Sequence, residues 1–162
     1  MALRSFNNPQ ARFLDFFSKT GTDASNEVPP QGLTATGGVI SDYTSPPGAV
    51  YRAHVFTSSG TFSVSSIGNL GSNVEYLVVA GGGGGATHWG GGGGAGGLRT
   101  NLSGHPLAGA AFPVSPGSYT VTVGAGGNGA PPGGNGTGPQ GFVGSDSVFG
   151  SITSNGGGGG GA

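Results

Sequence analysis

Three times in this chain, a short segment of β-forming residues runs directly into a block of glycine. Residues 74–80 lead into 81–85 and, after a four-residue interruption, into 90–94. Residues 119–123 lead into 124–129, and residues 148–153 lead into 156–161. Glycine loses more conformational freedom on ordering than any other residue, so these blocks become ordered only where something holds them. The repeat therefore predicts a structural element built from backbone rather than an active site.

We expect the ordered blocks to form an extended helix of three residues per turn that resembles polyproline II. Ordering one residue costs about 1–2 kcal/mol, whereas one net hydrogen bond contributes only about 0.5–1.5 kcal/mol. A lone glycine strand therefore stays loose. In a packed array, paired backbone groups and added Cα–H···O contacts nearly offset the free-energy cost of ordering the chain. Flanking β-strands that fix the register would then favour the ordered state. The blocks follow no strict Gly-x-y phase, which excludes collagen.

Composition alone is ambiguous about whether the chain folds. Glycine (40) and proline (11) make up nearly a third of the 162 residues, a level typical of disordered chains. However, only 7% of residues are charged and the net charge is −1, whereas disordered chains are usually kept expanded by charge. The five basic residues are dispersed, which argues against binding to nucleic acid. We therefore expect a chain that needs a partner, or its own folded bundle, to stay soluble.

The absence of certain sequence features narrows the class further. Cysteine is absent, so neither disulfides nor thiolate metal sites hold the fold. No apolar run reaches the length of a membrane helix, and the start lacks the apolar core of a signal peptide. We accordingly expect a protein made in the cytoplasm of a cell without an ordinary secretion signal and without membrane insertion.

Residues 1–37 differ in composition from the rest and are predicted to be an N-terminal anchor segment. Asn8 is a good N-cap, Pro9 a good first helical residue and Gly21 a plausible stop, which predicts a short helix at about 9–20. A polar, extended linker follows. The apolar residues of this segment are expected to dock on a partner: Phe6, Phe13, Leu14, Phe16 and Phe17. The alternative is a terminal helix that packs on its own domain.

Residues 38–162 are predicted to be a glycine-rich, all-β domain, small and β-sandwich-like, with polyglycine II-like segments. Residues 51–56 and 61–64 flank Ser58-Ser59-Gly60, which indicates a hairpin. Residues 74–80 are apolar on both faces, as in a central strand. Residues 119–123 alternate as in a half-buried strand.

The motifs that usually signal catalysis or cofactor binding lack their context here. Residues 124–129 match G-x-G-x-x-G, but the following Ala130-Pro131-Pro132 forbids the helix that a dinucleotide site requires. His54, His88 and His105 have no partners at metal-ligand spacing. No nucleophile turn occurs. We therefore expect no cofactor, no metal site and no enzymatic activity.

Thr87-His88-Trp89 interrupts a glycine block with a hydroxyl, an imidazole and an indole side chain, groups that could bind a ligand. These residues could form an exposed contact for a sugar or a receptor surface, because tryptophan offers a large, rigid face. The favoured interpretation is instead that Trp89 lies flat over glycine backbone and shields it, since tryptophan is usually mostly buried.

An ordered set of five motifs resembles the glycine-rich domain of tail-fibre and other virion-surface proteins of tailed bacteriophages. The motifs span residues 51–62, 74–81, 94–97, 117–127 and 147–152. The resemblance covers about residues 38–162 and implies a fibre or tail protein, some relatives of which pack their glycine segments as polyglycine II. It implies that the N-terminal segment attaches to the virion.

The function expected on this basis is that of a structural virion protein of a tailed bacteriophage, most simply a tail fibre or fibre-like appendage. Its expected partners are itself, as a homotrimer, other virion proteins through the N-terminal segment, and a host cell-surface receptor. The alternatives are a self-assembling extracellular filament subunit and an ice- or surface-binding module.

Overall fold

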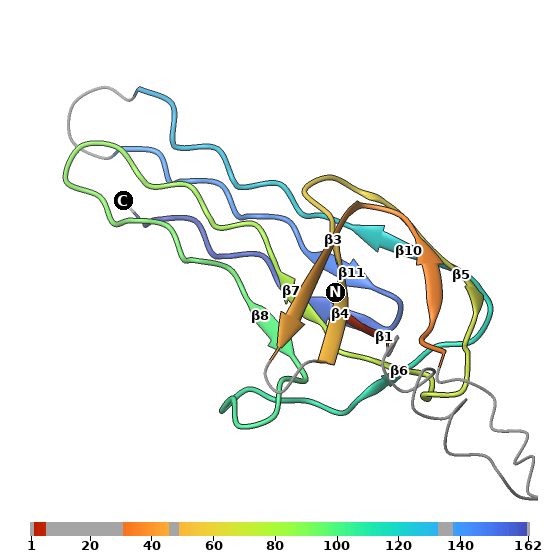
Figure 1. The fold of residues 1–162 in the computed structure, drawn as a ribbon. Coiled ribbons are helices and arrows are strands. Elements are labelled where there is room, and N and C mark those ends of the chain that lie inside the picture. The colour runs from red at the N-terminus through yellow and green to blue at the C-terminus, as the bar shows by residue number, and fades with distance from the viewer. Residues whose placement is uncertain (1, 6–30, 46–48, 133–137, 162) are drawn as a thin grey trace, which may run out of the picture.

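The computed structural model describes residues 2–5, 31–45, 49–132 and 138–161. Every regular element among these residues is a strand, so the described part of the chain is all-β (Figure 1). The strands are β1 (Ala2–Ser5), β2 (Thr34–Thr36), β3 (Val39–Ser45), β4 (Ala49–Val55), β5 (Gly60–Ser66), β6 (Asn73–Val74), β7 (Leu77–Val79), β8 (Leu98–Thr100), β9 (Phe112–Pro113), β10 (Gly117–Thr122), β11 (Ser147–Phe149) and β12 (Ile152–Ser154).

The strands form four sheets in which all named neighbours are antiparallel. The largest sheet has the order β12-β11-β10-β5-β2, and a three-stranded sheet has the order β1-β4-β3. Two further pairs, β6 with β9 and β7 with β8, complete the set. Because β10 lies between β5 and β11, segments far apart in the sequence share one sheet.

An aromatic cluster holds the sheets together. Phe62 is completely buried, and its ring lies 5.1 Å from that of His54 and 6.0 Å from that of Phe149, between ring centroids. Phe112 and Tyr119 pack against the same group. The remaining buried apolar residues of this core are Leu33, Ala35, Val64, Val74, Tyr76, Val114 and Val121. Val121 is buried between exposed Thr120 and Thr122, which confirms the predicted half-buried strand.

The hairpin predicted around residues 58–60 is wrong. β4 pairs with β1 and β3, whereas β5 pairs with β2 and β10, so residues 56–59 carry the chain from one sheet to another. The Ser59 hydroxyl accepts a hydrogen bond from the Val123 amide at 3.0 Å. The local turn signal was real, but both edges of β5 are taken by strands distant in sequence.

The central strand predicted at residues 74–80 is also wrong. The segment is divided into β6 and β7, and β7 pairs only with β8. Leu77 and Val79 are 61% and 51% exposed. The break at residues 75–76 arises because Asn101 ties this segment down with its side chain: it accepts from the Tyr76 amide and donates to the Val74 carbonyl.

The predicted helix at about 9–20 and the docking residues Phe6, Phe13, Leu14, Phe16 and Phe17 lie outside the described residues. Two parts of the predicted anchor segment are described, however. β1 pairs with β4, and β2 pairs with β5. Within residues 31–37, Leu33 and Ala35 are buried in the core.

Candidate functional site: the glycine array and its tip

Five extended segments leave the sheets side by side and project to one end of the molecule (Figure 1). We name them PG1 (80–86), PG2 (91–97), PG3 (124–130), PG4 (138–145) and PG5 (155–161). PG1 directly continues β7, and PG2 leads back into β8. PG3 follows β10, PG4 precedes β11 and PG5 directly continues β12. Each segment is therefore continuous with a strand that is paired in a sheet. This confirms the sequence prediction that β-strands run into ordered glycine blocks.

Hydrogen bonds join the segments with a period of three residues. In PG1, Ala80, Gly83 and Ala86 donate to PG2, at 3.0, 2.8 and 3.0 Å. The next residue of each triplet, Gly81 or Gly84, donates to PG4.

PG1 also accepts hydrogen bonds from two further segments. PG3 donates to the carbonyls of Gly82 and Gly85, and PG5 donates to those of Gly81 and Gly84. PG1 is therefore the centre of the array, with four described neighbours.

Bare backbone is required at many positions of the array. A Cβ atom placed on Gly81, Gly83 or Gly84 would lie less than 3.0 Å from a carbonyl oxygen of a neighbouring segment. The Cα–H bond that replaces the side chain points at that oxygen instead, which adds a weak Cα–H···O contact. The contacts expected from the sequence are therefore present, and they explain why alanine is absent at these positions.

PG4 is the segment that the sequence analysis missed. Within it only every third residue must be glycine, because Gly138, Gly141 and Gly144 face PG1 or its tip, while Phe142 and Val143 are 57% and 70% exposed. The segment thus has a local Gly-x-y phase, although the blocks as a whole have none. That triplet spacing was the signal that could have located it.

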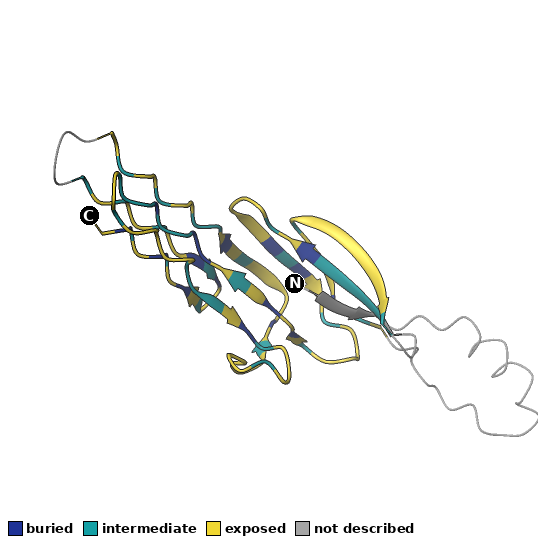
Figure 2. Cartoon of the chain, turned by 90° about the vertical axis from the view of Figure 1, so that its left-hand side faces the viewer, coloured by how far each residue is buried: buried dark blue, intermediate teal, exposed yellow. Residues whose placement is uncertain are grey.

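The turn between PG1 and PG2, green in Figure 1, lies at the free end of the array, far from the sheets, and Figure 2 shows this end from a second side. It contains Thr87, His88 and Trp89, and His88 adopts a positive φ of 57°. Trp89 is 102% exposed, so the favoured interpretation that it shields glycine backbone is wrong. The reason is geometric: the segments pack against each other, and the reversal of the chain directs the indole into solvent.

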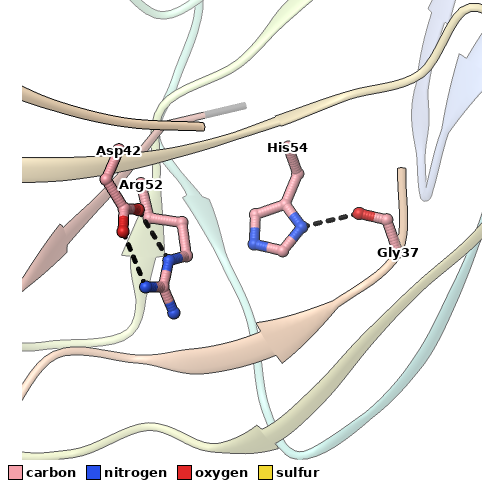
Figure 3. A network of polar contacts seen from close by, with 4 residues as sticks. All are labelled: Gly37, Asp42, Arg52 and His54. Carbon is pink, nitrogen blue, oxygen red and sulfur yellow. Dashed lines mark hydrogen bonds and ion pairs between the residues drawn. The ribbon is translucent and has the colours of Figure 1, made fainter. Parts of the chain in front are cut away.

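A second polar group lies between the two larger sheets (Figure 3). His54 is 1% exposed and its Nδ1 donates to the carbonyl of Gly37 at 2.7 Å. Gly37 has φ +113°, and a Cβ there would overlap the Thr61 carbonyl, so glycine is needed for this close approach. Burial lowers the pKa of His54, against the opposing effect of the Gly37 hydrogen bond.

On the exposed part of the three-stranded sheet, Arg52 makes a bidentate ion pair with Asp42. Nε and Nη2 donate to Oδ1 and Oδ2 at 2.7 and 2.8 Å, and the pair links β4 to β3 (Figure 3). This hydrogen bonding lowers the pKa of the Asp42 carboxyl. Because both side chains are more than 40% exposed, the pair fixes strand register rather than stability.

The stability of the protein is expected to fall below about pH 6.5, because the unfolded chain then protonates His54 whereas the folded chain keeps it neutral. The lowered pKa of His54 in the fold sets this direction. Urea unfolding at pH 8, 6.5 and 5 measures the effect. His54→Phe should flatten the profile relative to the wild type; an equal slope in the two proteins would contradict the assignment.

Two shallow, mainly apolar grooves lie between the three-stranded sheet and β7. One, of about 310 Å³, is lined by residues that include Val55, Leu77 and Val79, and the other, of about 440 Å³, by residues that include Tyr43 and Leu98. Among the described residues, no three His, Asp or Glu side chains gather as a metal site would require. The described part also contains no helix long and apolar enough to cross a membrane.

The G-x-G-x-x-G match at residues 124–129 has a structural use in place of a cofactor site. These residues begin PG3, where Gly127 donates to the carbonyl of Gly82. A Cβ on Gly124 or Gly127 would overlap carbonyl oxygens of PG4. The glycines are thus explained by packing within the array.

Residues 57–162 match the family model of the glycine-rich domain. The match covers more than half of the chain, from the approach to β5 through all five PG segments, and the chain belongs to this glycine-rich domain family. No curated protein and no solved structure matches the chain.

Proposed function

We propose that this chain is a structural virion protein of a tailed bacteriophage, a tail fibre or fibre-like appendage. In this proposal the N-terminal segment attaches to other virion proteins and the small, sandwich-like β domain holds a polyglycine II bundle. The tip of the bundle touches the host cell surface. The proposed role is that of a mechanical spacer and a receptor-binding element, without catalysis. The protein is made in the host cytoplasm and resides in the virion.

The observation that carries the proposal is a fully exposed Trp89 at the free end of an array of bare backbone. The three-residue period of the hydrogen bonds is that of an extended helix of the polyproline II class. Such an array is a rigid spacer with few side chains to bind anything on its own flanks. The sequence resemblance to virion-surface proteins points to the same use.

The chemistry of the tip suits a surface contact. Tryptophan presents a large, rigid apolar face with one N–H donor, and such residues dominate the free energy of binding at interfaces. His88 adds an exposed polar ring beside it on the same turn, whereas the Thr87 hydroxyl is buried. A sugar ring or a loop of a receptor protein fits this combination.

The proposal is tested in virions that carry the chain, with one variant for each end. Trp89→Ala is expected to leave the amount of protein per particle unchanged and to lower the adsorption rate on host cells at least tenfold, because a central aromatic anchor is worth about 2 kcal/mol or more. Replacing Phe13, Phe16 and Phe17 by serine is expected to remove the protein from the particle, because these residues are proposed to dock on virion proteins.

Each variant controls for the other, and Leu102→Ala serves as a matched surface control because Leu102 is 54% exposed in the loop after β8. Normal adsorption of Trp89→Ala particles would refute the role of the tip. Normal incorporation of the serine variant would refute the anchor. A self-assembling filament, the alternative, would form from purified protein without any virion.

A further inference from the structure

The array has two layers, and one of its outer faces is bare. PG1 is bonded to all four other segments, while PG4 and PG5 are bonded to each other and both to PG1. PG2 and PG3 are not bonded to each other by any described hydrogen bond. One layer is therefore PG2–PG1–PG3, and PG4 and PG5 cover one side of it. No described PG segment covers the other side, which we call the open face.

The open face leaves backbone donors of the central segment unused. The amides of Gly82 and Gly85 donate to no described residue, although the residues on both sides of each in PG1 do donate. Both glycines are partly exposed, whereas Gly81 and Gly84 are buried. The carbonyl of Gly83 likewise accepts from no described backbone amide, and it points away from PG4 because the Gly84 amide of the same peptide unit donates to PG4. PG1 therefore presents one free donor per turn.

Glycine also persists on this face where the packing of the chain does not demand it. A Cβ on Gly126 or Gly129 would lie 3.6 or 3.9 Å from the nearest carbonyl oxygen, and one on Gly85 would lie 3.8 Å away. These are ordinary van der Waals distances. On the solvent side of PG3, by contrast, the same segment carries Ala125 and Asn128.

PG4 likewise carries side chains where it faces solvent, since Phe142 and Val143 are exposed there. Side chains are thus admitted on flanks that face water, yet the open face keeps bare backbone at every position around the free amides. At Gly82 a Cβ would lie 3.3 Å from the Gly94 carbonyl oxygen, but Gly85, Gly126 and Gly129 have no such steric reason. A face that stays bare at these positions and carries a periodic row of free donors has the properties of the buried faces of the array.

We propose that a second copy of this chain covers the open face. The occupant must be extended, must repeat every three residues to follow the donors of Gly82 and Gly85, and must itself be bare at the contact. The PG2–PG1–PG3 layer of another copy meets all three requirements. Because the same face would serve in both copies, the contact closes as a twofold pair.

Hydrogen-bond complementarity favours this occupant over an unrelated surface. The open face carries the unused amides of Gly82 and Gly85 and the unused carbonyl of Gly83, all on PG1, so two such faces can pair donors with acceptors and bring their Cα–H bonds against opposing oxygens. A flat apolar partner would leave these polar groups buried and unpaired, which is unfavourable. The pair differs from the homotrimer expected from fibre symmetry, and it does not depend on the proposed function.

The test is the mass of the purified full chain in solution, measured by sedimentation over a hundredfold range of concentration. The wild-type protein is expected to have the mass of two copies. Gly129→Gln should weaken the pair at least tenfold, because its side chain enters the contact while its Cβ has room in the single copy. Gly158→Gln is the matched control, since Gly158 lies on PG5 in the other layer with nothing within 4 Å of its Cβ.

Amide exchange supplies a second measurement that does not depend on mass. The Gly82 and Gly85 amides should exchange slowly in the pair and at least tenfold faster in Gly129→Gln. A wild-type mass of one copy or of three copies would overturn the proposal. So would a pair that Gly129→Gln and Gly158→Gln affect equally, or fast exchange of both amides in the wild type.

Discussion

Replacing Gly84 by alanine is expected to lower the free energy of unfolding by about 3 kcal/mol, an effect at the upper end of overpacking. Gly84 lies in the central segment, and the added methyl would overlap the Asn128 carbonyl oxygen of PG3. Relief would require PG1 and PG3 to separate. That shift would weaken the hydrogen bond from Ala130 to Gly85, and the Gly84 amide bond to Phe142 would move with it. Thermal and urea unfolding measure the change.

Gly158→Ala is the control for this prediction, since its Cβ meets nothing within 4 Å and its φ is not in the left-handed region. It should be neutral or stabilising by about 0.4–1 kcal/mol, because alanine restricts the unfolded chain. If Gly84→Ala and Gly158→Ala had equal stabilities, the array would not be closely packed, and the contacts described for PG1 would be wrong.

The sequence predicted the array well because its physics is local and repetitive. A β-forming run followed by glycine needs neighbours for its backbone, and β7, β10 and β12 supply roots that set the register. PG4 is not predicted from glycine richness, because it is not a block of glycine. Gly138, Gly141 and Gly144 satisfy the steric requirement with one glycine in three, so Phe142 and Val143 concealed the segment.

The errors in the β domain have a common cause, which is that strand partners are chosen by long-range packing. β5 pairs with β2 and β10 because burial of Phe62 and Val64 requires strands on both sides, whereas the local Ser-Ser-Gly signal favours a hairpin. The turn between PG1 and PG2 likewise depends on long-range packing that the local sequence does not predict. The residues Thr87–Trp89 were identified as candidates, but whether Trp89 covers backbone or faces solvent depends on how the segments pack, which composition does not encode.

Replacing Phe62 by alanine is expected to destabilise the protein by about 3–5 kcal/mol. The side chain is completely buried and its ring contacts those of His54, Tyr119 and Phe149. Removing it leaves a cavity between the five-stranded and the three-stranded sheet. Urea unfolding followed by far-UV circular dichroism measures the change, with Phe142→Ala as the exposed aromatic control, for which a change within about 0.5 kcal/mol is expected.

Phe62→Ala also tests whether the PG segments stay ordered when the strands that they continue are destabilised. Ordering one glycine costs more than one net hydrogen bond contributes, so the PG segments are stable only while the strands that they continue, β7, β8, β10, β11 and β12, hold them in register. Phe62→Ala should therefore lower the protection of the Gly83 and Gly94 amides, both of which are bonded within the array, by the same factor as that of core amides in β10. Retained glycine protection at a urea concentration that melts the β core would show that the array is stable by itself, and the dependence of the bundle on its sheets would have to be abandoned.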